Sequence, residues 1–299
     1  MKSFFSQTLT VLNLSYCENV PLTLFLVCPN LREVYLDLVF DSRDDGYPDT
    51  QCSGRELPAL ECLNYRHSAS LVKQMITPSP KFSMAVVDWS KLRVLKLCPE
   101  EFIGMGCLQP ILDAACNTLE ELHLTNPHAT CCPGGMFSLF ISTLISKELQ
   151  IGGQLYLPGL VNLRHLPNLH VFAVYSVIRS DTPEPVVLRD IKLVLRTIPK
   201  ANQVTKLSLD LIIYCGQFFS ECLEDDWNGM CDEFVRISAG KPLELNLEIL
   251  ITPRPMFPLA PLTRDQLYER IKEKIAPLSD YPNICTNFGV LVQSRDLRV

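Results

Sequence analysis

The stretch from Leu9 to Leu14 reads LTVLNL, with leucines at its first, fourth and sixth positions. This L-x-x-L-x-L spacing returns along most of the chain. Clear copies begin at Leu31, Leu92 and Leu119, degenerate copies begin at Leu60, Leu169 and Val204, and two weaker ones hold Leu149-Ile151 and Leu245-Leu247. The first five copies begin at residues 9, 31, 60, 92 and 119, so their starts are 22, 29, 32 and 27 residues apart. We therefore interpret the sequence as a repeat array.

Each copy predicts a short strand, because apolar residues that alternate with others face one side of a sheet. Residues 21–28, 68–76 and 107–116 have helical patterning, and residues 186–198 (VVLRDIKLVLRTI) place apolar side chains along one helix face before Pro199. Strands alternating with helices at this period predict a leucine-rich-repeat solenoid. The expected fold is α/β: a curved right-handed stack of short parallel strands, about nine irregular repeats long, with helices on the convex side.

The array divides into two predicted parts. Residues 1–251 form the solenoid, and residues 252–299 form a proline-rich connection, a helix and a short strand that cap its C-terminal end. Thr263 and Gln266 have the spacing of a capping box for a helix that runs to about Ala276. Phe288 and Val290 belong to the final alternating strand.

The amino-acid composition and charge argue against several classes of function. The 299 residues are 47% hydrophobic, which is enough for a packed core, and no apolar run approaches the roughly 18 residues of a membrane span. The net charge is −6 without a visible basic stripe, so neither nucleic acid nor a membrane is an expected partner. Thirteen cysteines without a convincing export signal indicate reduced, mostly buried thiols. We expect a cytoplasmic or nuclear protein.

The first repeat carries a more specific pattern. Cys17 follows the strand, and Cys28-Pro29-Asn30-Leu31 leads into the next copy, while Cys116-Asn-Thr-Leu119 repeats the second half. This pattern resembles the cysteine-containing class of leucine-rich repeats, in which the cysteines are small buried apolar residues. That class is similar to the substrate-receptor region of F-box proteins, which bridge a target to an SCF-type ubiquitin ligase. The resemblance covers roughly residues 9–250.

The resemblance implies a protein-interaction module, the substrate-recognition region of an F-box-like receptor. The F-box itself, a helical module that precedes the repeats in that family, is absent, because the first repeat begins at Leu9. A Skp adaptor and a cullin are therefore expected partners only of a longer form that contains an F-box. The alternative is a stand-alone leucine-rich-repeat scaffold with no link to a ligase.

A second alternative is a metal-dependent or cysteine enzyme that uses the cluster His123, His128, Cys131 and Cys132. Zinc sites favour paired ligands at spacings such as C-x₂₋₄-C, which this cluster lacks. No cysteine carries a local catalytic signature. We therefore predict no catalytic residue, no metal and no cofactor, and we interpret Glu224 to Asp226 as solvated loop charges.

The predicted binding surface is the concave face of the sheet, where the strand residues that point away from the core gather. Mixed charges and tyrosines are typical of protein-recognition surfaces. The predicted contact residues are Glu33, Tyr35, Asp37, Asn64, Arg66, Lys96, Glu121, His123, Gln150, Tyr175, Lys206 and Asp210.

Overall fold

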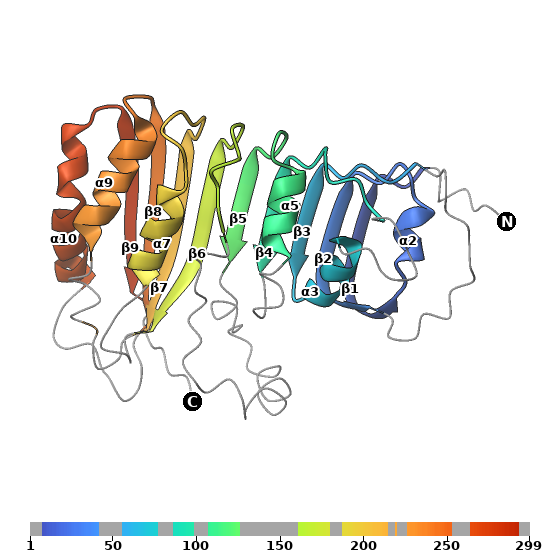
Figure 1. Ribbon diagram of the computed structural model, residues 1–299. Coiled ribbons are helices and arrows are strands. Elements are labelled where there is room, and N and C mark those ends of the chain that lie inside the picture. The colour runs from blue at the N-terminus through green and yellow to red at the C-terminus, as the bar shows by residue number, and fades with distance from the viewer. Residues whose placement is uncertain are drawn as a thin grey trace, which may run out of the picture. The chain divides into compact units, whose positions relative to one another are not determined.

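The computed structural model describes residues 8–41, 56–76, 86–98, 107–125, 161–179, 187–214, 219, 226–252 and 264–292. The chain divides into two compact units. Figure 1 labels their helices and strands. Unit 1 comprises Met1–Thr125 with His165–His170, and unit 2 comprises Asn126–Arg164 with Val171–Val299. Both units are α/β, with strands that pair in parallel and in chain order. The prediction of a parallel α/β architecture is thereby confirmed.

Unit 1 contains five of the described strands and three short helices. The strands are β1 (Val11–Val20), β2 (Glu33–Asp41), β3 (Cys62–Arg66), β4 (Val94–Cys98) and β5 (Glu121–Thr125), and the helices are α2 (Thr23–Leu26), α3 (Ala69–Ile76) and α5 (Leu108–Ala114).

Unit 2 contains four described strands and longer helices. The strands are β6 (Val171–Arg179), β7 (Lys206–Tyr214), β8 (Leu243–Thr252) and β9 (Ile284–Val292), and the helices are α7 (Val187–Arg196), α9 (Trp227–Ser238), α10 (Arg264–Ile275) and the 3₁₀ helix η2 (Ala276–Asp280).

The leucines of the repeated spacing form the core. Val34, Leu63, Leu95 and Leu122 occupy the same register position on β2 to β5, and each is completely buried. Leu12 holds the equivalent position on β1 but is only half-buried, because β1 pairs with β2 alone among the described strands. Each strand therefore buries its leucines only where neighbours cover both sides, as stacked units require.

One backbone arrangement recurs where the strands of unit 1 begin. A single carbonyl accepts the N–H groups of two consecutive residues, the one just before the next strand and the first residue of that strand. The Thr10 carbonyl accepts from Arg32 and Glu33 at 2.8 and 3.0 Å, and the Arg32 carbonyl accepts from Glu61 and Cys62 at 2.7 and 3.1 Å. The carbonyls of Glu61 and Arg93 repeat this arrangement with the following strands. All four carbonyls belong to the residue after the first leucine of a template copy, so the sequence register is also the structural register.

The helix predicted over residues 186–198 is present as α7, with Ile191, Val194 and Leu195 buried. The helix predicted after Thr263 is present as α10, with Leu267 and Ile271 buried. The final alternating strand is β9, which pairs in parallel with β8 and so extends the sheet. The connection over residues 253–263 lies outside the described residues.

Helix α9 differs from expectation. Asp226 is its N-cap: the side chain accepts a hydrogen bond from the Gly229 N–H at 2.9 Å and pairs with Lys192. Asp226 is exposed, as interpreted, but it is not a simple loop charge, because its carboxylate satisfies an N–H that the first turn of a helix leaves unpaired. Glu224 and Asp225 lie outside the described residues.

The described cysteines differ in burial: Cys62 and Cys116 are half-buried and Cys285 is exposed, so the implied burial of Cys116 is not observed. Cys28, Cys107 and Cys231 are buried, and burial raises the pKa of each thiol, that of Cys231 to about 11. These thiols are therefore protonated at neutral pH and poor nucleophiles. Cys17 is only half-buried because it lies on β1, at the edge of the sheet. The implied burial of this cysteine is thus not observed.

Candidate functional site

On β2 to β5 the residues that alternate with the core leucines form one surface, which we call the open face of unit 1. They are half-buried, and they include the predicted contact residues Glu33, Tyr35, Asp37, Asn64, Arg66, Lys96, Glu121 and His123. Tyr35, Asn64, Lys96 and His123 share one register position on four adjacent strands. The structure therefore brings the predicted residues of unit 1 together in rows across the strands.

Tyr35 is held by its neighbours on the open face. Its hydroxyl donates to the Glu33 carboxylate at 2.9 Å. This hydrogen bond, with smaller contributions that include Cys62 on the next strand, raises the pKa of Tyr35 to about 12. The ring thus has a fixed position and a neutral hydroxyl. One row further along the strands, Arg66 lies beside Asp37, with the Nε and Oδ1 atoms 3.9 Å apart.

His123 lies at the last strand of this face. Its Nε2 is 3.3 Å from the Glu121 carboxylate. Burial, supported by the nearby Lys96 charge, lowers the pKa of His123, although Glu121 acts in the opposite direction. The imidazole is therefore neutral at pH 7 and offers a directional hydrogen bond.

The described residues do not bring His123 into a metal site. They contain no group of three or more histidine, cysteine and carboxylate residues that could hold a metal ion. His128, Cys131 and Cys132, the other members of the predicted cluster, lie outside the described residues.

In unit 2, the predicted residues Tyr175, Lys206 and Asp210 lie on the corresponding side of β6 and β7, opposite the core. Lys206 pairs with Glu244 on β8 at 2.8 Å. Asp210 lies in register with Tyr175 on one side and with Glu248 on the other. Burial and the Glu248 charge raise the pKa of Asp210. Gln150, the remaining predicted contact residue, lies outside the described residues.

Sequence reasoning missed a second feature of unit 1, a row of alternating charges where the strands begin. We call Arg32, Glu61, Arg93 and Glu120 the charge ladder. Arg32 and Glu61 are 3.6 Å apart, and Arg93 contacts Glu120 through two hydrogen bonds of 2.9 and 2.8 Å. All four residues directly follow the first leucine of a template copy. Comparison of that one position across the copies would have revealed the alternation.

No known protein family matches this chain. Neither a curated protein nor a solved structure matches it either. Within the described part of the chain, no helix has the length and apolar character needed to cross a membrane.

Proposed function

We propose that this chain is a protein-interaction module of the leucine-rich-repeat type, and that it is the substrate-recognition region of an F-box-like ubiquitin-ligase receptor. The repeat assignment rests on the L-x-x-L-x-L spacing and on the shared register of the buried positions in β2 to β5. It also rests on the backbone carbonyls that each accept two consecutive N–H groups where the strands begin. The link to a ligase rests on the sequence pattern around Cys28 and Cys116.

The observation that carries the binding role is the row Tyr35, Asn64, Lys96 and His123 on the open face. Adjacent strands are about 4.8 Å apart, so four strands place these side chains along a line of about 14 Å. The row combines an aromatic ring, an amide, a cation and a neutral imidazole. Such a surface offers a partner one anchor and several directional hydrogen bonds, which is how protein interfaces obtain specificity.

The fixed side chains make this row a pre-organised surface. Tyr35 is held by Glu33, and His123 is held by Glu121. Binding of a partner therefore costs less side-chain conformational entropy than it would if these side chains were unrestrained.

The experiment uses the chromosomal gene with a C-terminal affinity tag, so that any longer form is captured. Proteins that co-purify with the wild type are compared with those of an open-face variant, Tyr35→Ala with Lys96→Glu. A control variant makes the same two chemical changes elsewhere, Tyr281→Ala with Lys200→Glu, at exposed positions of unit 2.

If the gene encodes a longer form with an F-box, we expect a Skp adaptor and a cullin with all three proteins. One further partner should be lost from the open-face variant alone. Retention of every partner by the open-face variant would exclude this face as the contact surface. Partners without any adaptor or cullin would instead identify a stand-alone scaffold.

A further inference from the structure

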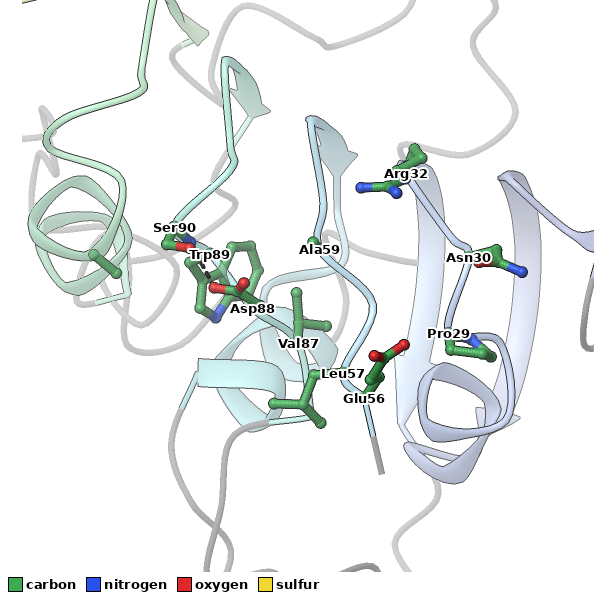
Figure 2. Close-up of a pocket in the computed structure, with 11 residues that line it drawn as sticks. Pro29, Asn30, Arg32, Glu56, Leu57, Ala59, Val87, Asp88, Trp89 and Ser90 are labelled. Carbon is green, nitrogen blue, oxygen red and sulfur yellow. Dashed lines mark hydrogen bonds between the residues drawn. The ribbon is translucent and has the colours of Figure 1, made fainter. Parts of the chain in front are cut away.

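A groove of about 720 Å³ lies where the strands of unit 1 begin (Figure 2). Most of its lining comes from three segments that each lead into a strand, and Ala114 of α5 completes it. Pro29 to Arg32 precede β2, Glu56 to Ala59 precede β3, and Val87 to Ser90 precede β4. Its volume is within the range of about 300–1,000 Å³ that is common for ligand sites.

The backbone in the middle wall has unused hydrogen-bonding groups. Ala59 forms an isolated parallel bridge with Asp88, in which the Pro58 carbonyl accepts from Asp88 N–H at 2.9 Å and Leu60 N–H donates to the Asp88 carbonyl at 3.3 Å. Along an extended strand, alternate residues direct their N–H and C=O groups to opposite sides. Those of Leu57 and Ala59 therefore point away from Asp88, toward the wall formed by Pro29 to Arg32.

No described residue takes up these groups: the backbone hydrogen bonds in this part of the structure leave Leu57 and Ala59 unpaired. The ladder between β2 and β3 begins only at the Arg32 carbonyl, which accepts from Glu61 and Cys62. The groove is thus a short sheet edge, two residues long, that is open to another strand.

The charges around this edge are unbalanced. The one guanidinium, on Arg32, lies 3.6 Å from Glu61. The carboxylates of Glu56 and Asp88 have no ion-pair partner among the described residues, and the Asp88 carboxylate accepts only the Ser90 N–H, at 2.9 Å. Trp89, 6% exposed, adds a largely buried aromatic ring to the wall. The groove therefore combines an apolar wall with an excess of negative charge.

We propose that this groove binds an extended segment of a partner protein that carries a lysine or arginine. The segment adds a strand along Leu57 and Ala59, whose backbone groups supply the hydrogen bonds. Its basic side chain lies against the carboxylates of Glu56 and Asp88. This site is separate from the open face and does not depend on the ligase proposal.

The test begins with random heptapeptides displayed on phage and selected on the purified full chain. Selected peptides are then synthesised with a fluorophore and titrated by fluorescence anisotropy. We expect peptides that contain Lys or Arg, whose affinity falls about fivefold or more in the Glu56→Lys variant and weakens with added salt. The Glu273→Lys variant makes the same charge change at an exposed position of α10, and it should bind as the wild type does.

Chemical changes in the peptide test the strand pairing without any risk to the fold of the protein. Methylation of alternate backbone nitrogens should abolish binding in one register and leave it intact in the other, because only alternate N–H groups face the Leu57–Ala59 edge. Substitution of the basic residue by norleucine should weaken binding about as much as Glu56→Lys does.

Several results would overturn the proposal. They are the failure to select any peptide, equal binding to the Glu56→Lys variant, and equal tolerance of methylation in both registers. Loss of binding in the open-face variant Tyr35→Ala with Lys96→Glu would move the site to that face. A dimer in light scattering that dissociates on Glu56→Lys would identify a second copy as the occupant instead.

Discussion

Units 1 and 2 share a parallel strand topology but differ in the helices and polar contacts that accompany their strands. In unit 1 the described helices have 4, 8 and 7 residues, and the exposed charge ladder spans the strands where they begin. In unit 2, helices α7, α9 and α10 have 10, 12 and 12 residues, and α7 and α9 are joined by polar contacts around a buried carboxylate. Parallel strands in chain order are therefore compatible with exposed ion pairs, as in unit 1, and with ion pairs to a buried carboxylate, as in unit 2.

The carboxylate that these contacts surround is that of Glu233, which is 7% exposed. It accepts from Arg196 Nε at 2.9 Å and from Arg236 Nε at 2.6 Å. Arg236 also donates to the carbonyls of Leu195 and Ile198, both at 2.7 Å. One guanidinium thus neutralises a buried charge and donates to two backbone carbonyls at and just after the C-terminal end of α7, of which that of Leu195 also accepts from Ile198 N–H at 3.0 Å.

The largest effect should come from Arg236→Ala. This change leaves Glu233 without its more buried cation and removes a hydrogen-bond donor from the carbonyls of Leu195 and Ile198, so we expect a loss of about 3 kcal/mol in the free energy of unfolding. Urea denaturation measures it. Arg196→Ala is the matched control, because Arg196 contacts the same carboxylate from an exposed position and should cost less than about 1 kcal/mol. Equal losses would show that burial does not distinguish the two arginines.

A smaller effect of opposite sign should come from Asp210→Asn. The folded-state pKa of Asp210 is raised, so folding is favoured while the group is protonated, and this stability is lost as pH rises from its unfolded pKa of about 3.9 through the folded pKa. Asparagine removes the repulsion from Glu248, and we expect a gain of about 0.5 kcal/mol at pH 7 and none near pH 3. Thermal unfolding at the two pH values checks this. A stability loss at pH 7 would show that the carboxylate has a stabilising role.

The smallest effect belongs to the charge ladder. The Arg93 guanidinium holds the pKa of Glu120 below its ordinary value. Its contribution is therefore present above the unfolded pKa of about 4.3 and is lost as pH falls through the folded pKa. We expect Glu120→Gln to lower the urea midpoint slightly at pH 7 in low salt, and less in 0.5 M NaCl or at pH 3. The same decrease at all three conditions would assign Glu120 a role other than ion pairing.

The sequence predicts those elements whose residues carry a local signal. The spacing of leucines locates β1 to β5, and the periodicity of residues 186–198 locates α7. Helix α9 was not predicted, although Trp227, Met230, Phe234 and Ile237 are buried at helical spacing along it. This spacing is a local signal that the sequence contains.

The two candidate binding surfaces, the open face and the groove, also differ in how far the sequence predicts them. Alternation along each strand identifies the open-face residues, because side-chain direction in a strand follows directly from sequence position. The groove could not be predicted, because its lining comes from parts of the chain that are far apart in sequence. Its unused hydrogen-bonding groups depend on the backbone path of Leu57 to Ala59, which no residue pattern specifies.

The carbonyls of Thr10, Arg32, Glu61 and Arg93 fix each strand of unit 1 at its first residues. The spacing between copies nevertheless varies from 22 to 32 residues. Alignment of the strands thus depends on a local backbone contact and not on how much chain connects them. Insertions and deletions between these strands can accumulate during evolution without shifting the strands against one another, which makes the connections suitable positions for grafting new peptide loops.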